Sequence, residues 1–374
     1  MPTLFGRTFD RRDLARHVGD FRQLFGVELH ELSDGQERGV RVLRFRTGGG
    51  FSFEVLVDRG MDVGAVEFRG VPIGWRSAMG FRSPWLHEND AELGLGWLRS
   101  FCGLVNTCGL DHIMGPTEED ADHYAYPYRP RVAHGLHGRV AFTPARLTGY
   151  GTRWDGDRCI LWAEGEVRQA TMFGENLQLT RRFEAEVGGD SLTMKDRVTS
   201  GSFRKTPHAM LYHVNVGWPV LSPESRVVVP LVRTRTYVHD PKVTSIGAIE
   251  QAPPQSGFVE QVYEHELKPA ADGTAFAALV NPGFAFASGE KGLGFVVEYD
   301  TRTMPAFYQW QNLQEGDYVI GLEPATVLAG SREEWKQRGD LKFLEHGQSV
   351  DYMLRLSAVA GQDALANLER RAGA

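Results

Sequence analysis

Short runs in which apolar and polar residues alternate are the main pattern along this chain. Residues 39–46 and 51–57 alternate with a period of two and are separated by three glycines, which predicts a β-hairpin. The three glycines do not indicate a phosphate-binding loop, because neither a Gly-Lys-Ser/Thr sequence nor a helical pattern follows them. Further strands are predicted at residues 63–68, 139–142, 159–167, 177–187, 192–198, 209–216, 225–229, 275–280, 295–299, 307–311, 318–322 and 352–359. Many short strands separated by polar turns predict an all-β sandwich with few short helices.

Helical patterns occur only near the two ends. Residues 8–25 predict a short amphipathic helix capped by Thr8 or Asp10, and residues 365–371 predict a closing helix. We therefore expect an N-terminal helical extension over residues 1–38 and a single β-sandwich domain over residues 39–374. Two long segments, 109–134 and 241–261, show little periodicity and are typical of functional lids or of disorder. The first of them is expected to set ligand specificity.

Composition narrows the classes of partner and compartment. The net charge of −7 and pI of about 6.0 give no broad basic surface, so we expect no nucleic-acid partner. Three cysteines are too few for a disulfide framework and fit a reducing compartment. No apolar run is long enough to span a bilayer, and the first residues lack the apolar region of a signal peptide. The expected location is the cytoplasm, without membrane association.

Glu323 is the first candidate for chemistry. It is the only carboxylate between residues 318 and 330, in a Gly-Leu-Glu-Pro-Ala-Thr segment predicted to form a turn after the strand at 317–320. A desolvated carboxylate at a strand end is a candidate general base. The alternative is a turn glutamate whose oxygens accept hydrogen bonds from backbone N–H groups.

Two histidine motifs supply candidate partners for Glu323. In His134-Gly-Leu-His-Gly-Arg139, the glycines around His137 allow close approach of the backbone to a ligand, and Arg139 offers a planar set of donors. The alternatives are a glycine-rich turn, or half of a metal site formed by His134 and His137. In Leu211-Tyr-His-Val-Asn-Val-Gly217, a strand would place His213 and Asn215 on one polar face. That face would line a site, or else face solvent.

Arg59, Asp62 and several tryptophans are weaker candidates. Arg59 and Asp62 flank Gly60 at a strand end and would either form a structural ion pair or bind substrate. Trp75 and Trp310 are candidate platforms for a sugar ring, although most aromatic side chains pack in cores. There is no Gly-x-Ser-x-Gly elbow, and a buried structural thiol is the expected role of Cys108.

The order of these motifs resembles an aldose 1-epimerase-like family of the galactose mutarotase superfamily. The resemblance extends over residues 44–356 and rests on the motifs Arg59-Gly-Met-Asp, Gly70 with Gly74-Trp75, Thr107-Cys-Gly-Leu110, Leu136-His-Gly-Arg139, Tyr212-His-Val-Asn-Val-Gly217, Trp310 and Gly321-Leu-Glu-Pro324. It implies a β-supersandwich and a cofactor-free, metal-free reaction. It also implies that Glu323 takes the proton of the anomeric hydroxyl, that His213 protonates the ring oxygen and that His137 contacts the sugar.

Two positions depart from the pattern of the resembled family. The acidic ligand of a sugar hydroxyl has no clear counterpart, although Glu264 and His265 fall in the corresponding region. Arg139 replaces a glycine that galactose mutarotases usually carry, which suggests a different or anionic sugar. The further expected substrate ligands are Asn215, Arg59, Asp62, Trp75, His134, Trp310 and His265.

The resulting hypothesis is a carbohydrate-binding isomerase that interconverts the anomers of a sugar or sugar acid. Glu323 would be ionised and His213 protonated, and their ion pair would lower the pKa of the glutamate and raise that of the histidine. Expected partners are a small-molecule carbohydrate and a second copy of the chain in a homodimer. The alternatives are a non-catalytic sugar-binding or sensing protein, and a metal-dependent sugar isomerase or epimerase that uses His134 and His137.

Overall fold

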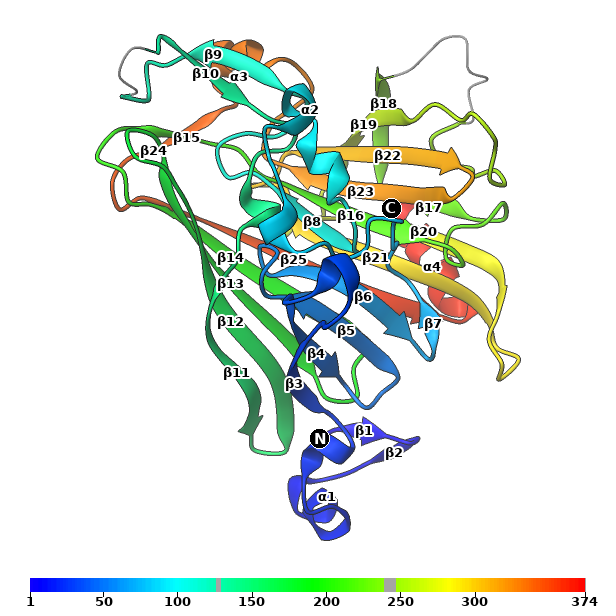
Figure 1. Cartoon of the computed structure of the whole chain (residues 1–374). Helices are drawn as coiled ribbons and strands as arrows, with labels where there is room; N and C mark the ends of the chain where they lie inside the picture. Colours follow the sequence, from blue (N-terminus) through cyan, green and yellow to red (C-terminus); the bar gives the residue numbers. More distant parts are fainter. Residues whose placement is uncertain (126–128, 239–246, 374) are drawn as a thin grey trace.

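Antiparallel β-sheets make up most of this chain, as the computed structural model shows (Figure 1). The structure describes residues 1–125, 129–238 and 247–373. An eight-stranded sheet contains, in spatial order, β11 (Arg146–Asp155), β12 (Arg158–Ala170), β13 (Asn176–Glu186), β14 (Ser191–Ser200), β25 (Ser349–Ala360), β21 (Lys291–Asp300), β20 (Thr274–Ala285) and β17 (Arg226–Val228). A six-stranded sheet contains β18 (Leu231–Val238), β19 (Gln261–Leu267), β22 (Ala306–Gln314), β23 (Asp317–Ala325), β16 (Leu211–Gly217) and β8 (Val105–Cys108).

Smaller sheets and short helices complete the described chain. The five-stranded sheet contains β3 (Gly26–Glu31), β4 (Arg41–Arg46), β5 (Phe51–Leu56), β6 (Asp62–Phe68) and β7 (Val71–Pro72). The two-stranded sheets pair β1 (Thr3–Leu4) with β2 (Arg7–Thr8), β9 (Thr117–Asp120) with β10 (Arg131–His134), and β15 (Thr206–His208) with β24 (Lys342–Leu344). The helices are α1 (Arg11–His17), α2 (Ala91–Gly94), α3 (Arg332–Arg338) and α4 (Gln362–Gly373). The predicted all-β sandwich with few short helices is confirmed.

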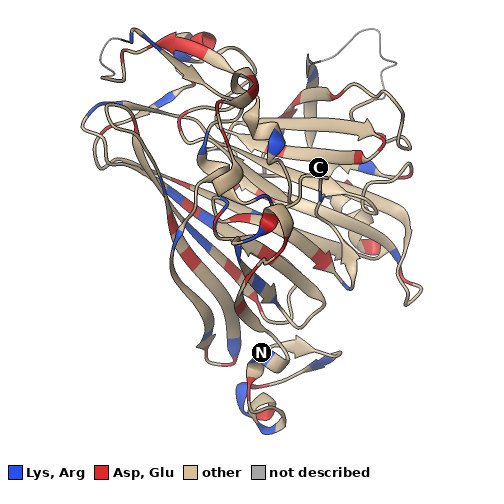
Figure 2. Cartoon of the chain, viewed as in Figure 1, with Lys and Arg blue, Asp and Glu red and all other residues tan. Residues whose placement is uncertain are grey.

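The main core lies between the eight-stranded sheet and the other two large sheets. Alternating side chains of each strand enter this core, which explains the period-two patterns of the sequence. On β16 the inward residues are Tyr212, Val214 and Val216, so His213 and Asn215 lie on the opposite face, as predicted. Many Lys, Arg, Asp and Glu residues lie along the strands of the eight-stranded sheet (Figure 2).

The N-terminal segment differs from the predicted helical extension. Asp10 caps the helix as expected, by accepting a hydrogen bond from the backbone N–H of Asp13, but α1 covers only Arg11–His17. Gly26–Glu31, within the segment predicted to be helical, forms β3 and pairs with β4. The alternation of this short strand is weak, and its pairing with the next strand, β4, decided its conformation.

Three other segments also differ from expectation. Within residues 139–142, predicted as a strand, Val140–Phe142 forms a buried 3-10 turn, because a short apolar run has the same composition in either structure. The segment 109–134, expected to lack regular structure, contains the β9–β10 hairpin. Gly321–Ala325, expected to be a turn, continues β23, so Glu323 lies within a strand between two neighbours. In the other long segment, residues 241–246 lie outside the described residues.

Candidate active site

The outward face of three adjacent strands in the six-stranded sheet forms the floor of a candidate site. The register of β16 and β23 pairs Leu211 with Ala325 and Asn215 with Gly321, which places His213 opposite Glu323. On the other side of β23, Trp310 of β22 pairs with Gly321. Because directly opposite residues share a face, one imidazole, one carboxylate and one indole converge there.

His213 and Glu323 are in close contact. The Nε2 atom of His213 lies 3.1 Å from Oε1 of Glu323, and both side chains are almost completely buried. Oε1 accepts no hydrogen bond from any residue that the structure describes, so the contact is close but not a well-aligned hydrogen bond. Gly321 makes room for the pair, since a Cβ atom at this position would lie 2.4 Å from Oε1 and 3.0 Å from Cε1 of His213.

Asn215 sets the orientation and tautomer of His213. Its Nδ2 group donates to the carbonyl oxygen of Gly103 and to Oδ1 of Asn106, so its Oδ1 atom is the acceptor that faces Nδ1 of His213. Nδ1 must therefore carry a proton, which leaves Nε2 as the ring nitrogen that faces Oε1 of Glu323.

Burial determines the charge state of this pair. Desolvation, with a smaller contribution from the charge of Glu260, raises the pKa of Glu323 to about 8. Desolvation, with a smaller contribution from His137, lowers the pKa of His213 well below its usual value. Both shifts are opposite to those of the expected ion pair of carboxylate and imidazolium, because burial favours a neutral glutamic acid facing a neutral imidazole. The pair holds one proton in either form.

A pocket of about 420 Å³ opens above the pair, a volume near the lower end of the range for small-ligand sites. Its aromatic lining comes from Trp97, Phe101 and Trp310. His137 enters from the covering loop with a φ of +57°, and its ring centroid lies 5.8 Å from that of His213. Burial, and to a lesser extent His112, lowers the pKa of His137 to about 3, so its imidazole is neutral.

Sequence reasoning missed several residues that line this pocket. The most informative is Glu260, which precedes β19 and accepts a hydrogen bond from Nε1 of Trp310 at 2.6 Å. It is an acidic group at the pocket, a role that was sought at Glu264 and His265. Its place near the end of a long aperiodic segment was the signal that could have identified it. The other missed lining residues are Leu95, Trp97, Leu98, Phe101, Met114, Gly115, Pro116, Leu136 and Val262.

Trp75 and His265 do not line the pocket. Trp75 packs behind it, with its ring centroid 5.1 Å from Phe101 and 6.3 Å from Trp310, so it supports the aromatic lining from outside. His265 lies on the opposite face of β19 from Glu264. It hydrogen-bonds Oε1 of Gln309 at 3.0 Å and is not a ligand of this site.

Arg59 and Asp62 are structural residues rather than ligands of the pocket. Arg59 is fully buried, and its guanidinium donates to the backbone carbonyls of Gly80, Arg82 and Ser100. Asp62 pairs with Arg181 at 2.6 Å in the core, not with Arg59. Arg59 and Asp62, although close in sequence, therefore have different buried partners.

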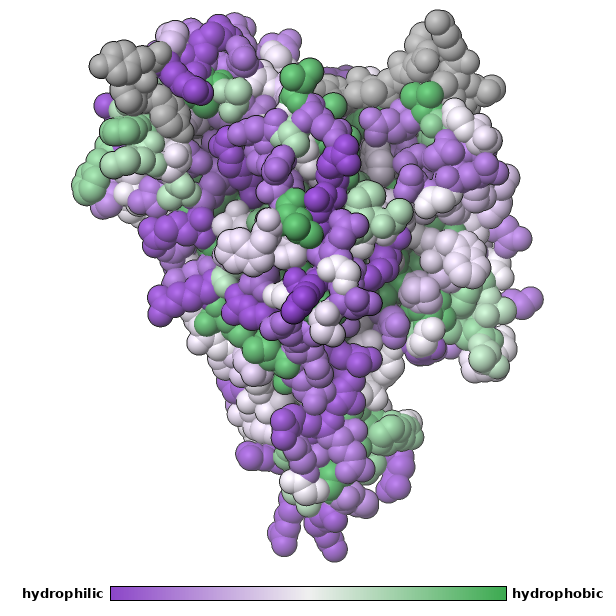
Figure 3. All heavy atoms as spheres, in the orientation of Figure 1, coloured by the Kyte–Doolittle hydropathy of each residue, from purple (hydrophilic) through white to green (hydrophobic). Residues whose placement is uncertain are grey.

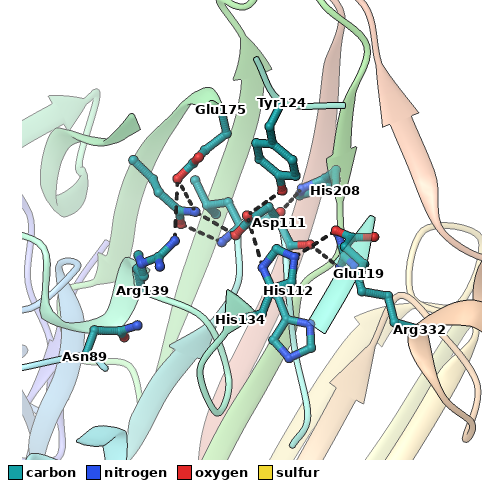
Figure 4. Close-up of polar contacts among 12 residues, drawn as sticks. Asn89, Asp111, His112, Glu119, Tyr124, His134, Arg139, Glu175, His208 and Arg332 are labelled. Carbon is teal, nitrogen blue, oxygen red and sulfur yellow. Dashed lines mark hydrogen bonds and ion pairs between the residues drawn. The ribbon is translucent and has the colours of Figure 1, made fainter. Parts of the chain in front are cut away.

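His134 and Arg139 belong to a second polar cluster (Figure 4). His134 contacts Oε1 of Glu119 at 2.7 Å, whereas Arg139 lies 4.0 Å from Glu175. Although burial opposes it, the hydrogen bonds from His134 and Arg332 hold the pKa of Glu119 below its usual value. The cluster therefore ties the β9–β10 hairpin to α3.

The two histidines of the His-x-x-His motif face different surroundings. His134 lies in the second cluster and His137 in the pocket, so the half metal site considered from sequence is not assembled. Within the described ranges, no group of three or more His, Cys, Asp and Glu side chains is arranged to hold a metal ion. None of the described helices has the length and apolar character that a membrane span requires.

A wider cavity, of about 550 Å³, lies over the outer face of the eight-stranded sheet. Its lining includes Arg197 and Asp351, which form an exposed ion pair at 2.7 Å. Charges paired in solvent are poor acid–base catalysts because their pKa values stay far from neutrality. The smaller pocket above Glu323 is therefore the better candidate.

Comparison with known proteins identifies the family and the fold. Residues 37–358 match the family model described as Domain of unknown function (DUF4432). No curated protein matches this chain.

Solved structures resemble this chain over most of its length. A protein from Klebsiella pneumoniae subsp. pneumoniae MGH 78578, described as a putative aldose 1-epimerase, superposes with a TM-score of 0.80 at 22% identity, covering 94% of this chain and 89% of that one. A galactose mutarotase-like protein from Clostridium acetobutylicum gives 0.57 at 14% identity, with 89% and 98% covered. Galactose 1-epimerase from Lactobacillus acidophilus NCFM gives 0.55 at 11% identity, with 90% and 99% covered. The resemblance to the galactose mutarotase superfamily is confirmed at the level of the fold.

Proposed function

This chain belongs to the DUF4432 family and has a galactose mutarotase-like fold, and on that premise we propose that it is an aldose 1-epimerase that interconverts the anomers of a sugar. The observation that carries the proposal is the buried contact of 3.1 Å between Nε2 of His213 and Oε1 of Glu323 in a pocket of about 420 Å³. Aromatic rings beside the pair suit the apolar C–H face of a sugar ring.

Glu323 and His213 can together supply the proton acceptor and the proton donor that the reaction needs. Anomer exchange requires removal of the proton from the anomeric hydroxyl and delivery of a proton to the ring oxygen, so one group must accept while the other donates. A single proton shared by Glu323 and His213 meets this condition without a change in total charge. The polar hydroxyls of a bound sugar lower the cost of charge in the pocket, so transfer of the proton from Oε1 to Nε2 creates the required carboxylate and imidazolium.

Ring opening then follows with balanced protons. Glu323 takes the anomeric hydroxyl proton, the bond between C1 and the ring oxygen breaks, and His213 protonates the ring oxygen to give the open-chain aldehyde. Glu323 is now protonated and His213 neutral, which is the state that burial favours. Rotation about the C1–C2 bond and closure by the reverse transfers give either anomer.

The test is proton NMR of anomeric exchange over a panel of aldoses with catalytic amounts of protein. Glu323→Gln and His213→Asn should each lower the exchange rate by about 10²–10⁴-fold, the usual contribution of one acid–base group. Glu298→Gln, on the eight-stranded sheet, is the matched control and should retain the wild-type rate. Saturable binding of a sugar without faster exchange would instead identify a non-catalytic sugar-binding protein.

A further inference from the structure

The polar and apolar groups of the pocket come from different parts of the fold. The sheet contributes His213 and Glu323, with Glu260 beside them, whereas the covering segments contribute mainly aliphatic side chains. These aliphatic residues are Leu95, Leu98, Met114, Pro116 and Leu136. Figure 3 shows hydrophilic and hydrophobic residues interspersed over the outer surface of this side of the molecule. A sugar bound here meets polar partners on the sheet side and, apart from His137, mainly hydrocarbon on the cover.

Two backbone carbonyls of the cover already accept hydrogen bonds from within the protein. The carbonyl oxygen of Met114 accepts a hydrogen bond from the backbone N–H of His137 at 2.9 Å. The carbonyl oxygen of Gly115 accepts one from Nε2 of His112, also at 2.9 Å. A sugar hydroxyl pressed against this cover would lose its hydrogen bonds to water without regaining them, which disfavours binding.

The charged groups of the pocket disfavour sugars that carry a carboxylate or a phosphate. No Lys or Arg lines it among the described residues, and its two carboxyl groups belong to Glu260 and Glu323. Arg139, which the sequence suggested as a ligand for an anionic sugar, lies in a separate pocket with Asp90 and Glu175. A carboxylate or phosphate on the sugar would therefore enter a site with acidic groups and no compensating cation.

We infer that the substrate is a neutral 6-deoxyhexose, whose methyl group lies against the aliphatic cover while its ring hydroxyls and anomeric centre face Glu323, His213, His137 and Glu260. This inference rests on the proposed function of the same pocket. The volume of about 420 Å³ suits one sugar ring rather than an oligosaccharide. The C6 group of a hexose can lose its hydroxyl without changing the pattern of ring hydroxyls. The aliphatic cover can therefore discriminate between sugars at C6.

The test compares sugars that differ only at C6, as pairs of 6-deoxyhexose and parent hexose: D-fucose with D-galactose, L-rhamnose with L-mannose, and 6-deoxy-D-glucose with D-glucose. Galacturonate and glucose 6-phosphate are the anionic arms. For at least one pair, kcat/KM for anomer exchange should favour the deoxy sugar by about 10-fold or more, the usual discrimination for one group in an apolar pocket. Both anions should be poorer than the parent hexoses. A parent hexose or an anion that equals or exceeds every deoxy sugar would overturn the inference.

Binding to Glu323→Gln separates this inference from the proposed reaction. Trp97 and Trp310 line the pocket, so their fluorescence reports occupancy without turnover. A lower Kd for the deoxy member of a pair supports the inference even if wild-type protein catalyses no exchange, in which case only the proposed reaction fails. Equal or reversed Kd values, or no binding of any sugar, overturn it.

Met114→Gln tests the aliphatic cover directly. The substitution keeps the length of the side chain and adds an amide that can pair with a hydroxyl, so it should reduce the ratio of deoxy to parent kcat/KM. Met353→Gln, on β25 at the molecular surface, is the matched control and should leave the ratio unchanged. An unchanged ratio in a folded Met114→Gln protein would show that the cover does not select the substrate.

Discussion

Replacing Gly321 with alanine should separate catalysis from folding. A Cβ atom at this position would lie 2.4 Å from Oε1 of Glu323, and an ordinary contact needs at least 3.4 Å, so the carboxylate must move by about 1 Å. A displacement of ~1 Å in a reacting group can cost roughly 10²-fold in rate. The same Cβ would lie 3.0 Å from Cε1 of His213 and from Cβ of Trp310, so strain of about 1–3 kcal/mol is expected. The backbone itself is not strained, because Gly321 has no positive φ.

The assay combines anomeric exchange NMR with thermal unfolding. Gly321→Ala should lower kcat/KM by about 10²-fold while the protein remains folded, because about 1–3 kcal/mol is a fraction of the stability of a typical domain. Gly19→Ala is the matched control, since no atom lies within 4 Å of the added methyl group and Gly19 is remote from the pocket. A folded Gly321→Ala protein with the wild-type exchange rate would refute the idea that the contact between His213 and Glu323 is the reacting centre.

The remaining predictions concern the carboxyl groups of the pocket and the buried ion pairs of Arg181. Above pH 8 the pair loses its shared proton, because burial raises the pKa of Glu323 to about 8, so kcat/KM should fall there. Glu260→Gln removes a negative charge that raises this pKa and should move the alkaline limb to lower pH; an unmoved limb would contradict the assignment. Asp62→Ala removes one of the carboxylates that pair with buried Arg181 and should reduce the free energy of unfolding in urea by about 3–5 kcal/mol, whereas exposed Arg197→Ala should change it by about 1 kcal/mol or less.

The main errors of sequence reasoning came from assuming that residues close in sequence share one site. Arg59 and Asp62 are three positions apart, yet Arg59 donates to carbonyls of the 80–100 segment and Asp62 pairs with Arg181. His134 and His137 are also three apart, but only His137 enters the pocket. Local spacing identifies neighbouring side chains in a helix. In loops and at strand ends, tertiary packing decides which groups a side chain contacts.

The sequence by itself indicated the sheet-rich fold, the polar face of β16 and, as separate candidates, Glu323 and His213, which the structure brings together as a pair. These features depend on period-two alternation and on a single carboxylate in an apolar segment, both of which are local properties. Only the tertiary structure decided which residues surround that pair. Strand register brought Glu323 opposite His213, the start of β19 placed Glu260 beside them, and the covering segments added an aliphatic wall, while Arg139 lies in a separate pocket. The charge state of the pair was also decided there, because desolvation depends on what packs above a strand and not on the residues within it.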